Sequence, residues 1–251
     1  MTGAIGDGVT AAVGDGVTAA VSAPQTRVVT GQPAGAPADL RDLFVSRTVT
    51  DRRTVHPGMV CDVVRETVDL GAAGVVRREF VQHPGAVGVL ALDDDDRALF
   101  IRQYRHPVGM ELWELPAGLL DIAGEPPLVA ARRELAEEAD LRADRWAVLI
   151  DWFSSPGGLT EALRLYLARG VSAVPAAERF TREAEELGMP VRWVPLDQAR
   201  DGVLAGRLHN PGTVVGVLAA CAARDQGWAT LRPADAPWPE HPAWRPPGLP
   251  G

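Results

Sequence analysis

The stretch that decides the fold is ELPAGLLDIAGEPPLVAARRELAEEADL, residues 114–141, in which a glycine-containing loop runs into a helical pattern. Three carboxylates of the helical half, Glu134, Glu137 and Glu138, stand three and four residues apart. At about 3.6 residues per turn, this spacing places them on one face. Like charges so close destabilise a solvated helix, and a divalent cation removes that penalty, because Mg²⁺ and Mn²⁺ prefer oxygen ligands.

Taken alone, three glutamates at this spacing also describe an ordinary surface helix with an acidic stripe. The neighbouring face favours a helix that is anchored on a core, because apolar residues recur there at helical spacing: Leu128, Ala131, Leu135 and Ala139. The residues that precede the helix decide between the two interpretations.

Those preceding residues complete a known pattern. Arg133 stands directly before Glu134, seven residues separate Glu125 from Arg133, and Gly118 opens the loop. The arrangement resembles the Nudix box: Gly, five residues, Glu, seven residues, Arg-Glu, an aliphatic residue, any residue, Glu-Glu, any residue, Gly and an aliphatic residue. A constellation of this length rarely arises by chance, so the chain is identified as a member of the Nudix family.

The box departs from the pattern at two positions. Six residues separate Gly118 from Glu125 where the pattern has five, and Gly124 can absorb the extra residue at little steric cost. Asp140 stands where the pattern has Gly, near a helix end that often needs a left-handed conformation. Asp tolerates that conformation better than most residues, and neither change removes a metal-ligating carboxylate.

The resemblance implies a metal-dependent hydrolase of a small nucleoside diphosphate. It places Mg²⁺ or Mn²⁺ on Glu134, Glu137, Glu138 and the carbonyl oxygen of Ala117, and it makes Arg133 the partner that holds the glutamates together. Glu125 belongs to the same catalytic array. The implied reaction is hydrolysis of ADP-ribose to AMP and ribose 5-phosphate. The alternatives are another nucleoside diphosphate sugar as substrate, or a non-catalytic Nudix domain that senses ADP-ribose.

Residues around the box resemble the ADP-ribose pyrophosphatase branch of the family. Arg105 stands in a Gln-x-Arg context, where a guanidinium can hold a phosphate through two parallel hydrogen bonds; its alternative role is a surface ion pair. Glu114 matches a glutamate before the box in that branch, and it can equally pair with an arginine. Pro156 matches a proline that marks the branch. With Gly118, these residues form the expected substrate-binding set.

Two acidic loops compete for the role of the catalytic base. Glu161, in a Ser-Pro-Gly loop, matches in placement a glutamate that acts on the catalytic water in some of these enzymes, and we favour it. The second loop, residues 183–186, contains the alternative bases Glu185 and Glu186. Either glutamate loop is also compatible with simple solvation.

Composition limits the other possible functions. A formal net charge of −8 argues against a general nucleic-acid binder, because no basic excess exists to displace phosphate counterions. No apolar run approaches the roughly 20 residues of a membrane span, and the N-terminus lacks a signal-peptide pattern, so we expect a cytoplasmic protein without a membrane partner. The two cysteines, Cys61 and Cys221, form no metal-ligand pattern and are expected as buried free thiols.

The rest of the chain alternates strand and helix patterns. Before and within the box we expect strands at residues 44–50, 59–70, 75–81, 85–92, 98–104 and 112–115, with residues 93–97 as a hairpin turn between the fourth and the fifth. After the box we expect strands at 146–152, 163–168 and 191–194, then helices at 196–204 and 212–224, the second capped by Asn210. The tail from Arg232 is rich in proline and tryptophan and should lack regular structure, either extended or wrapped around a partner.

This order predicts an α/β fold in which a mixed sheet lies between helices. The resemblance sharpens it to a Nudix-type α/β/α sandwich preceded by a small N-terminal antiparallel sheet that exchanges between two subunits, and so implies a homodimer. We expect four segments: a disordered low-complexity extension at residues 1–39, dimer-forming strands at 43–81, the hydrolase domain at 82–224 and the tail at 225–251.

Overall fold

The computed structural model describes residues 40–180 and 188–247. The chain divides into two units, Met1–Leu43 and Phe44–Gly251, and the described helices and strands lie in the second. The low-complexity extension at residues 1–39 and the acidic loop with Glu185 and Glu186 lie outside the described residues.

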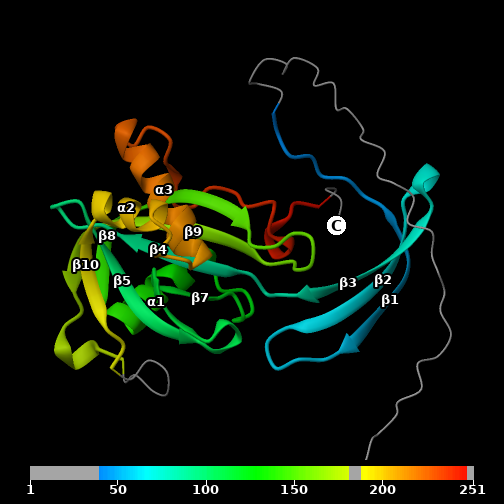
Figure 1. The fold of residues 1–251 in the computed structure, drawn as a ribbon, viewed down its shortest axis with the longest axis horizontal. Coiled ribbons are helices and arrows are strands. Elements are labelled where there is room, and N and C mark those ends of the chain that lie inside the picture. Colours follow the sequence, from blue (N-terminus) through cyan, green and yellow to red (C-terminus); the bar gives the residue numbers. More distant parts are fainter. Residues whose placement is uncertain (1–39, 181–187, 248–251) are drawn as a thin grey trace, which may run out of the picture. The chain divides into compact units, whose positions relative to one another are not determined.

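The central layer of the second unit is built from two sheets (Figure 1). The larger is mixed, because β4 pairs with β9 in parallel while its other neighbouring strands run antiparallel. Its order is β11-β8-β9-β4-β7, with bounds Arg232–Pro233, Leu141–Phe153, Ala162–Ala173, Ala86–Ala91 and Ala117–Leu119. The smaller sheet is antiparallel, in the order β10-β5-β6, with bounds Val191–Pro195, Arg97–Arg105 and Met110–Glu114.

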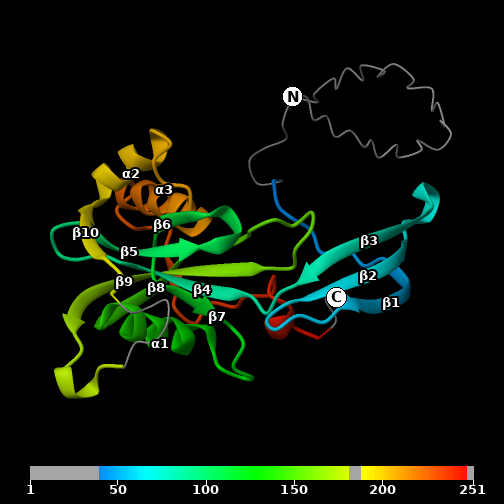
Figure 2. The ribbon, with the colours of Figure 1, turned by 60° about the horizontal axis from the view of Figure 1, so that its bottom comes forward.

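Helices cover both faces of this layer (Figure 2). Helix α1 (Pro127–Ala139) lies on one face, and α2 (Leu196–Leu204) and α3 (Pro211–Asp225) lie on the other. Strand β4 is buried along its whole length because its alternate residues serve two cores. Val87 and Val89 pack in the core that contains Leu135 of α1, whereas Leu90 packs in the core that contains Val217 of α3. The expected α/β/α sandwich is confirmed.

The ends of the helices follow their sequence signals. The Asn210 side chain accepts a hydrogen bond from the Thr213 N–H at 3.0 Å, and Pro211 occupies the first turn of α3, as the capping pattern predicted. No helix in the described part of the chain is long and apolar enough to cross a membrane.

The small N-terminal sheet is an antiparallel meander of β1 (Thr48–His56), β2 (Asp62–Asp69) and β3 (Val75–Gln82). The prediction for the first strand, residues 44–50, was wrong in position. Every residue of β1 is exposed, and the strand is held to β2 partly by an ion pair between Arg52 and its direct neighbour Glu66. A strand that is exposed throughout and mostly polar carries no regular apolar alternation, so its limits could not be read from hydrophobicity.

The predicted hairpin over residues 85–104 was only half right. The turn forms, with the Asp93 N–H donating to the Arg97 carbonyl at 3.0 Å and a single bridge between Leu92 and Ala98. Beyond that bridge the strands separate into different sheets, because β4 takes β7 and β9 as neighbours while β5 takes β6 and β10. Local sequence fixed the turn but not the pairing partners.

The C-terminal tail also differs from its prediction. It forms the short strand β11 and a 3₁₀ turn at Pro242–Trp244, and it packs on its own chain. The indole rings of Trp238 and Trp244 stack at 5.8 Å with an interplanar angle of 8°. Trp238 is buried, and the Arg164 guanidinium lies 4.7 Å from its ring centroid. Arg164 also donates to the carbonyl oxygens of Ala236 and Pro237, so a buried arginine anchors the proline-rich segment.

Candidate active site

The loop between β7 and α1 accommodates both departures of the box. Gly124 has a φ of +78°, a left-handed conformation that lets the loop contain its extra residue. Helix α1 then begins at Pro127 and ends at Ala139, and it is capped by Asp140, whose φ of 52° and ψ of 36° are left-handed. The Asp140 N–H donates to carbonyl oxygens of the last helical turn, as the replaced glycine would.

Arg133 gathers three carboxylates around one guanidinium. Its Nε and Nη2 donate to the two oxygens of Glu125 at 3.1 and 3.0 Å, which makes a bidentate pair across the loop. Its Nη1 donates to Glu134 at 2.5 Å and to Glu137 at 3.0 Å. Loop and helix are therefore connected by a single side chain, and Glu125 reaches the cluster despite the longer loop.

Two backbone positions on β7 complete the cluster. The Ala117 N–H donates to Glu138 Oε2 at 2.8 Å, which ties the last glutamate of the triplet to the strand. Gly118 lies against Glu134 so closely that an added Cβ would stand 2.0 Å from the Glu134 Cδ. Glycine at this position is thus required by the close approach of a carboxylate and not by backbone conformation.

The electrostatics of the cluster favour a cation. Glu134 and Glu138 are buried. Burial raises the pKa of Glu134, and the neighbouring charge of Arg133 opposes that rise. The hydrogen bond to Glu125 raises the pKa of Arg133, so the guanidinium stays charged. Three carboxylates contact the Arg133 guanidinium and Glu138 adds a fourth, so the cluster holds more negative charge than Arg133 neutralises.

The donor chemistry fits a hard divalent cation. Glu134, Glu137, Glu138 and the Ala117 carbonyl offer only oxygen ligands, which Mg²⁺ and Mn²⁺ prefer. Among residues 40–180 and 188–247, no three His, Cys, Asp or Glu side chains already converge as a metal site. Mg²⁺ is commonly held by one or two carboxylates together with waters and substrate phosphates, so a prebuilt cage is not required. Ligation would exchange part of the Arg133 hydrogen bonding for metal contacts.

Arg105 and Glu114 are partners of each other. Arg105 Nε donates to Glu114 Oε1 at 2.9 Å and Arg105 Nη2 donates to Glu114 Oε2 at 2.7 Å, across the β5–β6 pair. Glu114 is only 3% exposed, whereas the Arg105 side chain is 44% exposed. Arg105 and Glu114 thus form the ion pair that was the alternative role for each of them. The Arg105 side chain also reaches the surface, where a phosphate can approach it.

Glu161 sits in a polar group of its own. Its Oε2 accepts a hydrogen bond from the Ser154 hydroxyl, and its Oε1 lies 3.4 Å from His83 Nε2. His83 Nδ1 accepts from the Gly85 N–H at 3.0 Å, so the proton of a neutral His83 ring resides on Nε2 and faces Glu161. Nearby Cys61 has its thiol pKa raised, first by burial and then by the charge of Glu161.

The sheet register places Glu161 near the box without joining it to the carboxylates. Leu163, two residues after Glu161, pairs with Ala86, and Ala86 pairs with Leu119 of β7. Neighbouring strands lie about 4.8 Å apart, so Glu161 stands at the end of the sheet where the box loop begins. Its neighbours Ser154 and His83 do not belong to α1.

Pro156 lies in the loop between β8 and β9, which is attached to the N-terminal sheet. The Val81 N–H donates to the Gly158 carbonyl at 2.9 Å, and the Thr160 N–H donates to the Val81 carbonyl at 3.0 Å. Pro156 lines a cavity of about 850 Å³ together with Phe80, Gln82, Leu159 and residues of the tail. This cavity is therefore lined by segments that are far apart in the sequence.

Sequence reasoning did not identify His83 and Ser154 as neighbours of Glu161. One histidine and one serine that stand 71 positions apart in the sequence form no recognisable motif. The available signal was local: His83 stands between the end of a strand and Pro84-Gly85, where the chain must turn.

Comparison with known proteins agrees with this geometry. The NUDIX domain family model matches residues 82–212. The ADP-ribose pyrophosphatase of Mycobacterium tuberculosis (strain ATCC 25618 / H37Rv) is 43% identical over 189 residues, which cover 75% of this chain and 89% of that protein. The GDP-mannose pyrophosphatase of Cronobacter sakazakii (strain ATCC BAA-894) is 31% identical over 179 residues, 68% of this chain and 85% of that protein.

A solved structure shows the same fold. The crystal structure of an ADP compounds hydrolase superimposes with a TM-score of 0.60 at 20% identity, covering 74% of this chain and 99% of the other. From the matched domain, the relative at 43% identity and the shared fold, the chain belongs to the Nudix family of hydrolases, as its box predicted.

Proposed function

We propose that the protein hydrolyses the pyrophosphate of ADP-ribose to AMP and ribose 5-phosphate with Mg²⁺ or Mn²⁺ as cofactor. The observation that carries the proposal is the cluster of Glu125, Glu134 and Glu137 around Arg133, with Glu138 fixed on the Ala117 N–H. Nudix hydrolases generally depend on a divalent metal. The relative at 43% identity is named for ADP-ribose, which supports that substrate.

Four groups would hold the metal: the carboxylates of Glu134, Glu137 and Glu138 and the carbonyl oxygen of Ala117. A bound dication supplies neutralisation of the pyrophosphate charge and a lowered pKa for an attacking water. Arg133 keeps the carboxylates oriented, since its guanidinium contacts three of them. Gly118 leaves the space that the Glu134 carboxylate occupies.

We propose Glu161 as the group that orients or deprotonates the water. Ser154 donates a hydrogen bond to its carboxylate and His83 Nε2 lies 3.4 Å from its other oxygen, so both neighbours fix the position of the carboxylate. Its place at the box end of the sheet supports this role. Glu185 and Glu186 remain the alternative, and they lie outside the described residues.

We propose that residues within and around the Nudix box bind the substrate. Arg105, held by Glu114 and reaching the surface, would contact a phosphate. Pro156 and Gly118 would lie beside the substrate. Pro156 belongs to a loop that also pairs with Val81 of the N-terminal sheet, so this sheet would help to shape the binding site.

We further propose a homodimer in the cytoplasm. Residues 43–81 would form the dimer surface and residues 82–224 the hydrolase domain. Exposed apolar side chains on the N-terminal sheet, including Val49, Val55 and Val75, support a partner there. Both cysteines of the chain are free thiols, as is usual in a reducing compartment.

A second candidate substrate is GDP-mannose, because a relative at 31% identity is named for it. A substrate panel distinguishes the two. Purified protein is assayed with ADP-ribose, NADH, GDP-mannose, ADP-glucose and a nucleoside triphosphate, each with Mg²⁺ and with Mn²⁺. ADP-ribose should give the highest kcat/KM, with AMP and ribose 5-phosphate as products. A higher kcat/KM for GDP-mannose would replace the proposed substrate, and no cleavage of any compound would overturn the proposed activity.

A further inference from the structure

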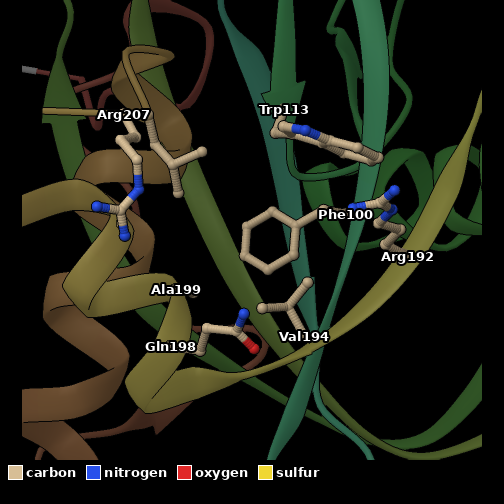
Figure 3. Close-up of a pocket in the computed structure, with 9 residues that line it drawn as sticks. Phe100, Trp113, Arg192, Val194, Gln198, Ala199 and Arg207 are labelled. Atoms are coloured by element: carbon tan, nitrogen blue, oxygen red, sulfur yellow. The ribbon is translucent and has the colours of Figure 1, made fainter. Parts of the chain in front are cut away.

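A second cavity lies away from the carboxylate cluster. It has a volume of about 330 Å³ and is enclosed by β5, β6, β10, α2 and the segment that follows α2 (Figure 3). This volume falls at the lower end of the range typical of small-ligand pockets, roughly 300–1,000 Å³. Its nine lining residues include no residue of α1 or of the loop that precedes α1.

The floor of this cavity is apolar and aromatic. Phe100, Arg192 and Val194 project from the same face of the antiparallel sheet, because Phe100 pairs directly with Arg192 and Val194 lies two residues further on. Trp113 stands above the Phe100 ring in Figure 3. An added Cβ at Gly202 of α2 would lie 3.3 Å from Leu208 Cδ1, so the glycine lets Leu208 pack closely on α2 at the edge of the cavity. Phe100 is only 2% exposed and lies beneath the floor, so the part-buried Trp113 is the aromatic ring that a flat ligand can contact.

The rim of this cavity is cationic. Arg192 and Arg207 stand on opposite sides of the cavity, and Gln198 of α2 lies at its lower edge in the view of Figure 3. The Arg192 guanidinium lies 5.2 Å from the Trp113 ring centroid. Within the described part of the chain, both arginines are exposed and neither guanidinium forms an ion pair or a hydrogen bond. In a chain of net charge −8, two arginines without a carboxylate partner beside an aromatic floor are complementary to an anionic aromatic ligand.

We propose that this cavity binds a nucleoside monophosphate. The base packs against Trp113, Arg192 and Arg207 hold the phosphate dianion, and the Gln198 amide offers both a donor and an acceptor to the base edge. Neither an uncharged nucleoside nor inorganic phosphate uses both halves of the site. The inference stands on the cavity itself and does not depend on the proposed hydrolase activity.

The test uses AMP and a signal specific to the cavity. The chain has seven tryptophans, so the indole N–H region of a two-dimensional ¹H–¹⁵N spectrum is simple, and Trp113→Phe assigns the Trp113 signal. Spectra are recorded with a chelator present, so that no metal-dependent reaction occurs. The Trp113 signal should shift saturably with AMP. In Arg192→Ala/Arg207→Ala the half-saturating AMP concentration should rise at least about tenfold, which corresponds to about 1.4 kcal/mol.

Arg169→Ala is the matched control. The Arg169 guanidinium lies 5.1 Å from the Trp228 ring centroid, a similar arginine–tryptophan contact that does not line the cavity. This variant should titrate like the unaltered chain, and the six other indole signals report whether each variant is folded. A Trp113 signal that does not respond to AMP, or one that titrates equally in the double variant, would overturn the inference.

Two further ligands test the assigned chemistry. Adenosine and inorganic phosphate should each bind at least about tenfold more weakly than AMP, because each lacks half of the recognised groups. Phosphate that binds as tightly as AMP would overturn the assignment to a nucleotide. The hydrolysis assay is separate, so loss of the proposed activity would leave the Trp113 titration unaffected.

Discussion

Gly118 shows how a single missing side chain supports the cluster. The Cβ of an alanine at this position would stand 2.0 Å from the Glu134 Cδ, and real Cβ contacts of this kind do not occur, so the carboxylate must move. We therefore predict that Gly118→Ala lowers kcat/KM for ADP-ribose by about 100-fold or more, the upper end of losses seen when a group supporting a metal ligand is removed. Metal affinity measured by calorimetry should fall with it, while thermal unfolding separates this effect from misfolding. Unchanged metal affinity would contradict the account of Gly118.

The pair of Arg105 and Glu114 combines a structural role with a proposed binding role. Glu114 is nearly buried, so Arg105→Ala removes a bidentate partner from a carboxylate that water barely reaches. We predict a loss of about 1–3 kcal/mol in the free energy of unfolding, the usual range for charged hydrogen bonds. With Glu114→Gln in a double-mutant cycle, the two losses should be less than additive by about 1 kcal/mol or more.

The same cycle tests the phosphate contact. If Arg105 binds substrate as proposed, Arg105→Ala raises KM for ADP-ribose more than Glu114→Gln does. Equal KM values for the two variants would show that Arg105 only forms the ion pair and would contradict its proposed contact with the substrate phosphate.

Single residues of the box were predictable because their spacing encodes their geometry. Three glutamates at helical spacing share a face, and a left-handed Asp140 was expected where the pattern has Gly. His83 and Ser154 were not predictable, because Glu161 meets them only after β3, β8 and β9 have been assembled. The role of Arg105 was open between a phosphate contact and an ion pair. The strand register pairs Arg105 with Met110 and Glu114 with Ile101, so the ion pair depends on the reach of the two side chains along the β5–β6 pair.

At the scale of elements, prediction succeeded for segments whose buried face makes apolar residues recur at a regular spacing. Helix α2 was predicted with its observed bounds, Leu196–Leu204, and α3 with its cap, because both have an apolar face or a capping signal. It failed for β1, which is exposed throughout and depends on cross-strand charges. It also failed for the pairing of β4 with β5, because partner choice depends on strands far apart in sequence.

The C-terminal tail is an element whose stability should depend on pH. His241 is buried, its Nε2 lies 2.8 Å from the Pro84 carbonyl oxygen, and its Nδ1 accepts from the Ala243 N–H. Burial lowers its pKa; the hydrogen bond to Pro84 opposes this shift, and the charges of Arg164 and Arg245 reinforce it. In the unfolded chain the ring takes up a proton below about pH 6.5, before the folded chain does. The unfolded state thus binds more protons, and stability falls as pH drops through that value.

We therefore predict that the contribution of His241 to the free energy of unfolding does not change with pH above about pH 6.5 and declines below it. His241→Gln should lose this component of the slope, since its amide can still donate but does not titrate. Exposed His209 provides the matched control, and His209→Gln should keep the slope. Denaturant unfolding between about pH 5 and 8 measures all three proteins. An identical slope in His241→Gln would contradict this account of the tail.

At the scale of the whole molecule, the fold followed from the box and the alternation of elements. The N-terminal sheet adds a feature that the single chain does not explain. Val49 and Val55 of β1 are individually exposed and would be covered in the proposed dimer.

We predict that the protein elutes with about twice the chain mass of 26.7 kDa in light-scattering chromatography. Val49→Glu/Val55→Glu should shift it toward the monomer, because burying two carboxylates at a subunit interface is unfavourable. The matched control introduces two glutamates at exposed apolar positions outside the N-terminal sheet, Val129 of α1 and Leu204 of α2. Dissociation in both double variants, or a monomer in the unaltered protein, would contradict the proposed interface.

The most direct test of the account compares the unaltered chain with Glu138→Gln. This change keeps the size of the side chain and its capacity to accept from the Ala117 N–H but removes the charge that would bind a dication. We predict that kcat for ADP-ribose with Mg²⁺ falls by about 100-fold or more while substrate affinity by calorimetry changes little. Glu178→Gln, which breaks only the surface ion pair with Arg142, should retain full activity. Near-normal turnover in Glu138→Gln would contradict the metal-binding role of the carboxylate cluster.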